Sequence, residues 1–310
     1  MLHRMDSRLE YRNCPGCGQD DFHVLFESNL EDRDFRGEVE TIYMLWGERH
    51  GRHVKCKNCH LIYVNPIENG GDIDEAYCQM KSADAAIIRD SRLRATESQV
   101  RLVRKYNEGT HLLDIGCGEG FFLFNASRFG YTAKGVEPAQ DAAAYARKEF
   151  GLDIEAKPFE ALQFPESQFD VVTLWQVLEH MPYPLMVLKE VHKILKPGGI
   201  AVITTPDIEG IPARILKMRW WCITRLHVNQ FTAGTLMNIL GNVGFKNISA
   251  VSYRESVSLL MLSIPILRYL RLYRPLRNLF SLNSSFGRIM NRIVLTYPST
   301  LDYCTVVGFK

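Results

Sequence analysis

Apolar residues come in short uninterrupted runs from His111 to the end of the chain, and segments with helical spacing separate most of them. Runs without polar alternation are typical of strands that are covered on both faces of a sheet. The runs that predict strands are HLLDIG (111–116), YTAKGVEP (131–138), LDIEA (152–156), FDVVTLW (169–175), GIAVITTPD (199–207) and DYCTVVGFK (302–310).

Glycines mark the ends of the helical segments between these strands. Gly130 closes GFFLFNASRFG, Gly151 closes AQDAAAYARKEFG, and a Pro-Gly-Gly turn closes YPLMVLKEVHKILKPGG. A later helix is expected in TAGTLMNILGNVGF. The alternation of strand and helix predicts an α/β fold with a parallel, doubly wound, Rossmann-like sheet, to which the last strand adds in the antiparallel direction.

The hydrophobic pattern divides the chain into three parts. Residues 1–70 form a small front domain, residues 71–110 a helical connection that covers one side of the next domain, and residues 111–310 the α/β domain. A helix is expected from Ala83 to Tyr106. Its apolar positions are Ile87, Leu93, Val100 and Val103.

The front domain carries two C-x-x-C pairs, CPGC (Cys14, Cys17) and CKNC (Cys56, Cys59). Each pair places two sulfurs on one side of a turn, and two such turns supply the four thiolates of a tetrahedral, structural zinc site. The alternative is four unrelated buried cysteines. Between the two pairs, additional strands are expected at FHVLFES (22–28) and VETIYMLW (39–46).

The composition is that of an ordinary globular protein, with 310 residues, 46% of them apolar, and a net charge of +2. This charge is too small to argue for nucleic-acid binding. Charged residues interrupt the first twelve positions, so we expect no signal peptide, a cytoplasmic location, and reduced cysteines that favour metal over disulfides.

The glycine-rich turn after the first α/β strand has the spacing G-x-G-x-G, at Gly116, Gly118 and Gly120. A dinucleotide site needs G-x-G-x-x-G and favours a diphosphate, which the acidic Glu119 would repel. This spacing counts against an NAD-dependent oxidoreductase or epimerase, which is the competing class.

Two carboxylates are expected at the same edge of the sheet. Asp114 ends the first strand and Glu137 ends the second, where a carboxylate accepts the ribose hydroxyls of a nucleoside. An electronegative pocket suits a ligand that carries an ammonium and a sulfonium. S-adenosylmethionine (SAM) is such a ligand.

The motifs LLDIGCGEG, GVEP, FDVVTLWQVLEHMPYP and LKPGGIAVITTPD, in this order, resemble those of class I SAM-dependent methyltransferases over about residues 111 to 250. The resemblance implies a seven-stranded Rossmann-like sheet, with the methionine end of SAM framed by Asp114, Gly116 and Gly118 and its ribose bound by Glu137. The remaining implied neighbours of SAM are Phe159 and Glu160 beside the adenine, and Trp175 and Gln176 at the methionine and the transfer site. Phe159 is equally explained as core and Glu160 as a solvated helix start.

The segments CPGCG and CKNCHLIYVNP, placed before that domain, resemble the zinc-ribbon methyltransferases of sugar and polysaccharide pathways. The resemblance implies a small zinc-ribbon domain that binds its metal through four cysteines, and a nucleotide-linked or lipid-linked sugar as the acceptor. The alternative acceptor is a lipid-tailed phenol, a quinone precursor, methylated on oxygen. RNA ranks below both, because the stretch around the ribbon is acidic.

Two histidines are candidates for the base that removes the acceptor's proton. His180 follows the fourth strand in LEHMP, and His227 precedes the late helix in RLHVNQFT. Imidazole has a suitable pKa for this role. His227 is the preferred candidate, and His180 is equally explained by a structural hydrogen bond.

The segment 256–300 is a basic amphipathic insertion. No acidic residue occurs from Ser256 to Leu301, whereas arginines recur. If 264–280 is one helix, a single face gathers Ile266, Leu270, Tyr273, Leu276 and Phe280. Such a helix fits anionic lipid, its own domain, or a second subunit of a homodimer. Peripheral membrane contact through this insertion therefore stays open.

Overall fold

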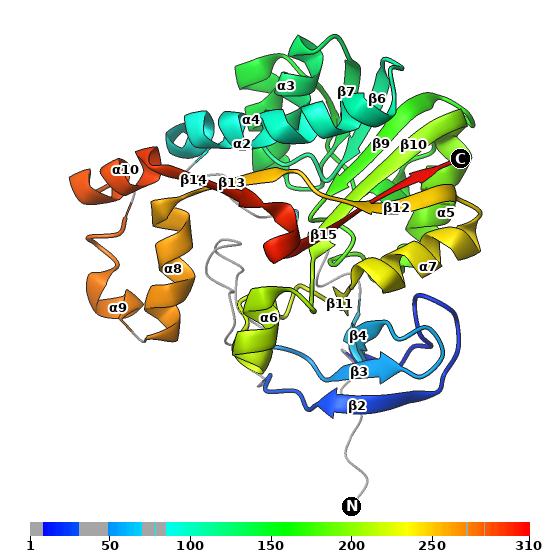
Figure 1. Ribbon diagram of the computed structural model, residues 1–310, viewed down its shortest axis with the longest axis horizontal. Helices are drawn as coiled ribbons and strands as arrows, with labels where there is room; N and C mark the ends of the chain where they lie inside the picture. Colours follow the sequence, from blue (N-terminus) through cyan, green and yellow to red (C-terminus); the bar gives the residue numbers. More distant parts are fainter. Residues whose placement is uncertain (1–8, 31–48, 70–77, 79–84, 271, 282) are drawn as a thin grey trace, which may run out of the picture.

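The computed structural model describes residues 9–30, 49–69, 78, 85–270, 272–281 and 283–310. Its centre is a seven-stranded sheet that helices cover on both faces (Figure 1). In spatial order the strands are β12 (Lys246–Val251), β15 (Tyr303–Phe309), β10 (Leu195–Pro206), β9 (Phe169–Trp175), β6 (His111–Ile115), β7 (Thr132–Val136) and β8 (Asp153–Glu155). β15 runs antiparallel to both of its neighbours, and the other pairs are parallel, which confirms the doubly wound Rossmann-like fold.

Neighbouring residues on each central strand point into different cores, as expected for strands covered on both sides. On β6, Leu112 packs in the core under a first set of helices, and Leu113 packs in the core under a second set on the other face. The first set of helices is α2 (Ala85–Tyr106), α3 (Phe121–Arg128) and α4 (Gln140–Phe150). The second set is α5 (Pro184–Ile194) and α7 (Ala233–Val243).

The strand order reverses between β6 and β9. The chain runs outward from β6 to β7 and β8, and then returns so that β9 pairs with the other edge of β6. Ile115 of β6 lies opposite Leu174 of β9 in the register. The loops that follow these two strands therefore meet at the carboxyl edge of the sheet, where doubly wound folds bind ligands.

A second sheet lies below the central one in Figure 1. Its spatial order is β11 (Asn229–Gln230), β4 (Ile62–Val64), β3 (His53–Cys56) and β2 (Phe22–Phe26). We call the described residues 9–30 and 49–69 the ribbon. β2 confirms the strand expected at 22–28, whereas the strand expected at 39–46 lies outside the described residues. The fourth strand, β11, comes from the α/β part of the chain.

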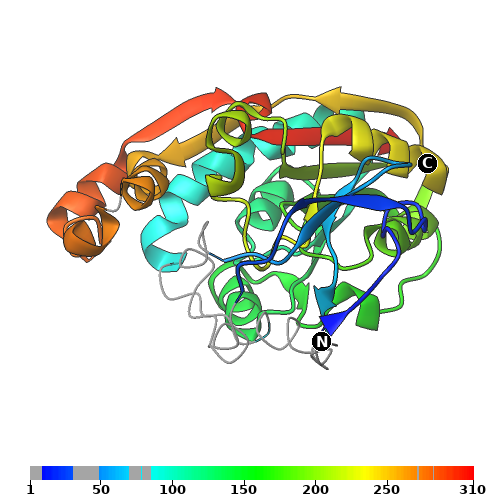
Figure 2. The same ribbon diagram turned by 90° about the horizontal axis from the view of Figure 1, so that it is seen from below.

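The ribbon packs on the same core as α5 and α7. Cys14, Leu61 and Tyr63 belong to the buried cluster that contains Ile239 of α7. A Cβ on Gly16 would lie 3.1 Å from Cδ1 of Ile239, so the first cysteine turn touches that helix closely. In Figure 2, seen from below, the ribbon strands lie in front of the central sheet.

Two expectations about helices need correction. The helix before β10 ends at Ile194, and the Pro-Gly-Gly turn lies within β10, where the pairing with β9 shifts between Leu195 and Ile200. The segment 264–280 is not one helix, because α8 (Leu259–Tyr269) ends before α9 (Tyr273–Leu276) begins. The amide of Leu272 donates to the carbonyl of Leu267, a turn that cannot continue the i to i−4 ladder.

The segment 254–298 forms an excursion that we call the lobe. It leaves the sheet along β13 (Arg254–Ser258) and returns along the antiparallel β14 (Val294–Pro298), with α8, α9 and α10 (Ser285–Arg292) between them (Figure 1). The remaining short elements are β1 (Leu9–Glu10), β5 (Ile67–Glu68), η3 (Phe159–Ala161), α6 (Ile211–Leu216), η4 (Lys217–Arg219) and η5 (Ser299–Leu301). Within the described ranges, no helix combines the length and apolarity that a bilayer crossing requires.

Candidate active site

The glycine loop after β6 places its glycines where other residues would be strained or would clash. Gly116 (φ +69°) and Gly118 (φ +52°) both have left-handed backbone. A Cβ on Gly116 would come within 2.4 Å of Val177, so this glycine lets the β6 and β9 loops touch. A Cβ on Gly118 would meet no heavy atom within 4 Å, so the backbone there is accessible to a ligand.

Glu137, at the end of β7, holds the glycine loop in place. Its Oε2 accepts the amide hydrogen of Gly118 (2.8 Å), and its Oε1 accepts that of Ala139 (2.9 Å). The side chain is buried, and burial raises its pKa. Each carboxylate oxygen retains a second lone pair, so Glu137 can still accept ribose hydroxyls. Its assignment to the ribose stays a prediction.

Asp114 is buried in β6 opposite Thr173 of β9, whose Oγ1 donates to its Oδ1 (2.6 Å). Burial is the main cause that raises the pKa of Asp114 to about 8, and the charge of Glu137 adds to it. Within the described residues, neither carboxylate forms an ion pair with a basic side chain. A ligand with a cationic group would favour the ionised form of these buried carboxyls, so the donor set fits SAM.

Trp175 and Gln176, which end β9, were expected beside the transfer site. The Trp175 ring packs against Phe122 (centroids 5.2 Å apart) and Tyr253 (5.7 Å), under α3. Gln176 has a left-handed backbone (φ +58°), and its amide donates to the carbonyl of Thr204 (2.7 Å). A non-glycine residue held in this conformation at a strand end is a strained position of the kind that clusters at functional sites.

Phe159 and Glu160, predicted beside the adenine, lie in η3 after β8. Phe159 is buried in the core under α5 and stacks on Phe164 with centroids 6.2 Å apart. Glu160 is exposed. Their contact with adenine stays a prediction.

The two candidate bases are brought together, although 46 positions separate them in the sequence. The rings of His180 and His227 lie 4.5 Å apart between centroids, at 77°. Burial lowers the pKa of His180, and it lowers the pKa of His227 to about 4. Both imidazoles are therefore neutral near pH 7. Whether either acts as the base stays a prediction.

Glu179 joins these histidines, and sequence reasoning missed it. The metal-ligating atoms of Glu179, His180 and His227 all lie within 4.8 Å of one another. Its buried carboxyl has an Oε2 with no hydrogen-bond partner among the described residues, and burial raises its pKa to about 8. The adjacent Glu and His in LEHMP were a sequence signal for such a group. His227, the third residue of the group, comes from the segment before β11.

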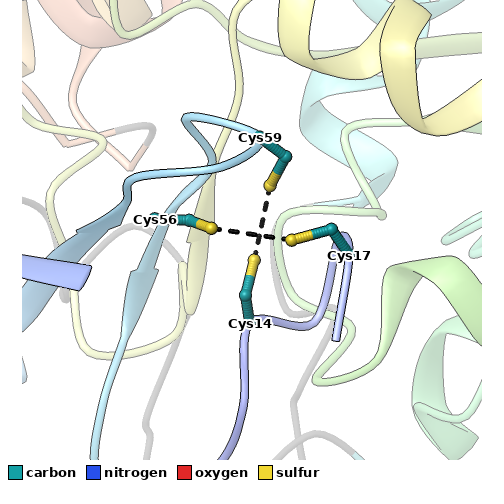
Figure 3. Close-up of side chains that lie close together, drawn as sticks. All are labelled: Cys14, Cys17, Cys56 and Cys59. Carbon is teal, nitrogen blue, oxygen red and sulfur yellow. Dashed lines mark hydrogen bonds between the residues drawn. The ribbon is translucent and has the colours of Figure 1, made fainter. Parts of the chain in front are cut away.

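The four cysteines of the ribbon converge on one point, as Figure 3 shows. Sγ of Cys14 lies 3.4 Å from that of Cys59, and Sγ of Cys17 lies 3.6 Å from that of Cys56. A tetrahedron with metal–sulfur bonds of about 2.3 Å separates its sulfurs by about 3.8 Å. The cluster therefore fits a Zn²⁺ ion held by four thiolates.

Arg12 is a second residue that sequence reasoning missed. Its buried guanidinium donates to the carbonyls of Val64, Pro182 and Val228. It thereby ties the ribbon both to the loop that follows Glu179 and His180 and to the segment that carries His227. Burial lowers its pKa to about 10, so it remains charged at neutral pH.

Comparison with known proteins gives one family and several partial relatives. A family model described as a methyltransferase domain matches residues 88–250. The ubiquinone biosynthesis O-methyltransferase of Ruegeria pomeroyi is 38% identical over 102 residues, which are 31% of this chain and 41% of that protein. The Coxiella burnetii protein of the same name is 27% identical over 124 residues, 38% of this chain and 51% of that protein. The chain thus spans about half the length, or less, of these curated relatives.

Solved structures show partial similarity as well. A SAM-dependent methyltransferase from Archaeoglobus fulgidus matches 70% of this chain and 94% of its own, with 19% identity and a TM-score of 0.49. One from Thermotoga maritima, described as a possible histamine N-methyltransferase, matches 73% and 93%, with 19% identity and a TM-score of 0.48.

Proposed function

Because the chain belongs to the family of methyltransferase domains and is a SAM-dependent methyltransferase, we propose that it methylates the hydroxyl of a lipid-tailed phenol. The observation that supports the cofactor assignment is the carboxyl edge of the sheet after β6, where Glu137 fixes the glycine loop next to the buried Asp114. When bound there, SAM would supply the methyl group. The acceptor hydroxyl would give its proton to a base, for which His227 is the candidate, and its oxygen would bond to the methyl carbon as S-adenosylhomocysteine leaves.

The residues of the chain have separate tasks in this proposal. Gly118 leaves room for the ligand, and Asp114 and Glu137, ionised when the cation binds, provide the negative charge that a sulfonium and an ammonium need. His180 and His227 activate the acceptor hydroxyl, because they lie together on the loops after β9 and before β11. Positioning the two reactants in line supplies much of the rate of such a transfer.

Two observations support the phenol over the sugar. The curated relatives are named for the O-methylation step of ubiquinone biosynthesis, although they match under half of this chain. The lobe exposes apolar side chains beside arginines and contains no acidic residue from Ser256 to Leu301, which suits an acceptor with a lipid tail. The cysteine cluster supports the sugar through its resemblance to zinc-ribbon enzymes, and the sugar is therefore the second candidate.

A direct test uses the purified full chain with methyl-labelled SAM and four separate acceptors: a polyprenylated catechol, a nucleotide-linked deoxysugar, a lipid-linked saccharide and RNA. Mass spectrometry identifies the product. We expect the label in the methyl ether of the catechol. Transfer to either sugar alone, or to RNA alone, would overturn the acceptor assignment and leave the methyltransferase assignment intact.

A matched pair of variants tests the histidines. His227→Gln should lower kcat about 10²-fold or more, and its SAM affinity should stay unchanged. His192→Gln is the control, because His192 lies on α5, where its ring packs on Phe245 and not on the His180–His227 pair. Equal kcat in the two variants would remove His227 from the site.

A further inference from the structure

A compact group of three potential metal ligands lies at the junction of the ribbon and the α/β domain. Glu179 and His180 belong to the loop after β9, and His227 belongs to the segment before β11. Their ligand atoms lie within 4.8 Å of one another. This group is separate in sequence from the four cysteines and offers nitrogen and oxygen in place of sulfur.

Backbone carbonyls fix the orientation of both imidazoles. Nδ1 of His180 lies 3.1 Å from the carbonyl oxygen of Leu226, and Nδ1 of His227 lies 2.8 Å from that of Cys222. A carbonyl only accepts, so each Nδ1 carries the hydrogen and each Nε2 carries the lone pair. Metal-binding histidines have this arrangement, because the second hydrogen bond fixes the tautomer and the ring orientation.

The carboxyl of Glu179 gives an independent sign of a missing partner. The residue is 2% exposed, and its Oε2 makes no hydrogen bond within the described part of the chain. A buried carboxylate without a partner is costly, and a cation is one way to remove that cost. The other way is a proton, because burial raises the pKa of this group to about 8.

The surrounding structure holds the group firmly. The amide of Asn229 donates to the carbonyl of Glu179 (3.1 Å), and Nδ2 of Asn229 donates to the carbonyl of Met181 (2.7 Å). β11 thereby clamps the loop that carries two of the three ligands. Metal sites need such a rigid frame, since ligand positions must be correct within a few tenths of an ångström.

We propose that Glu179, His180 and His227 bind a divalent transition-metal ion, with Zn²⁺ the first candidate, as a second metal site formed by the loop after β9 and the segment before β11. Two imidazoles and one carboxylate are a ligand set of catalytic zinc, which leaves a coordination position for an exogenous oxygen. The role of that position rests on the proposed function: it would bind the acceptor's hydroxyl oxygen and make its proton more acidic. With the ion bound, His180 and His227 would act on the acceptor through it, in place of a direct role as the base.

The decisive measurement is made on the full chain without acceptor or turnover. Metal-free protein is reloaded with Co²⁺, and the metal content is determined by mass spectrometry. Cobalt bound by the cysteines shows thiolate charge-transfer bands, whereas cobalt bound by the three new ligands shows ligand-field bands alone. We expect two metal ions per chain in the wild type.

Variants assign the two ions to their sites. Glu179→Gln and His227→Gln should retain the charge-transfer bands and lose one ion, and Cys14→Ser/Cys56→Ser should show the reverse. His23→Gln is the control, because His23 is an exposed histidine on β2. One ion per chain in the wild type, lost with the cysteines, would overturn the proposal.

X-ray absorption of the zinc-loaded wild type makes the test independent of how the variants fold. A mixed shell of sulfur and nitrogen or oxygen supports the second site, and a shell of sulfur alone contradicts it. Since no step of this test needs methyl transfer, its failure leaves the proposed function standing. A phenol that is not methylated would leave the metal site standing.

Discussion

At the scale of single residues, the buried carboxyls of Asp114 and Glu137 lead to a prediction about the pH dependence of SAM binding. The pKa of Asp114 is raised to about 8, so the carboxyl is largely protonated at pH 7 in the free protein. A bound cation favours the ionised form, so SAM binding should release a proton. SAM affinity should therefore increase as the pH rises towards about 8, by at most about tenfold per pH unit, and level off above it.

Titration calorimetry from about pH 6 to about pH 9 measures this dependence, and buffers with different ionisation enthalpies count the protons released. Asp114→Asn is the control. It should bind SAM more weakly and should flatten the pH dependence. An affinity that does not change with pH in the wild type would show that Asp114 keeps one protonation state throughout.

Two glycines with the same backbone strain separate ligand contact from folding. Gly118 (φ +52°) lies in the glycine loop, and Gly151 (φ +66°) ends α4; a Cβ on either would touch nothing within 4 Å. Alanine at each position should lower the free energy of unfolding by about 1 kcal/mol. In Gly118→Ala alone, SAM affinity should also fall, because its Cβ enters the space proposed for the ligand. Equal SAM affinity in both variants would place the ligand elsewhere.

At the scale of elements, the lobe is the segment with the most exposed apolar surface near basic charge. Exposed apolar residues occur on all three of its helices or beside them, and Arg277, Arg288 and Arg292 are exposed as well. The side chains of Arg268, Arg271 and Arg274, on which the sequence hypothesis rested, lie outside the described residues. Because α8 and α9 are separate, any contact with lipid involves a folded surface in place of one long helix.

Sedimentation with anionic liposomes tests this surface. The wild type should sediment, and the variant with Arg277, Arg288 and Arg292 changed to Glu should stay in solution, because each arginine near anionic lipid contributes about 1 kcal/mol. A matched variant with Arg101, Arg104 and Arg128 changed to Glu, on α2 and α3, controls for net charge. A wild type that stays in solution would assign the lobe to a protein contact.

The elements that the sequence predicted well are those with a local signal. β6, β9 and α4 have apolar runs or glycine stops of their own, and the structure confirms all three. The two-residue β11 has no periodic pattern, and its partner β4 lies far upstream, so pairing alone defines it. Glu179 could not be predicted as a site residue for the same reason. Its proposed role as a metal ligand depends on the nearness of His227, which only the fold produces. Phe159 could be located from the sequence, but its role could not be predicted. An aromatic residue after a strand can belong to the core or contact a ligand.

At the scale of the whole molecule, the ribbon and the α/β domain share one hydrophobic core. Cys14, Tyr63 and Ile239 belong to the same buried cluster. Loss of zinc from the cysteines would therefore loosen that common core. We expect a chelator that strips this site to lower the melting temperature of the entire chain in one transition, by about 10 °C or more, since structural zinc contributes several kcal/mol.

Differential scanning calorimetry with and without chelator, combined with metal analysis, checks this expectation. Cys222→Ala is the matched control, because it removes a buried cysteine outside the cluster and should keep the metal. Two separate transitions, of which the upper one is insensitive to the chelator, would show that the ribbon unfolds alone.

The pairing of β11 with β4 also has a consequence for protein synthesis. The strands β2, β3 and β4 leave the ribosome early, but the strand that completes their sheet ends at Gln230. Until then the edge of β4 remains unpaired, and the carbonyl of Val228 that accepts hydrogen bonds from Val64 and Arg12 has not been made. Most of the chain must therefore be translated before its first part can finish folding, and a nascent chain stalled before Val228 would present an open strand edge to chaperones or to other chains.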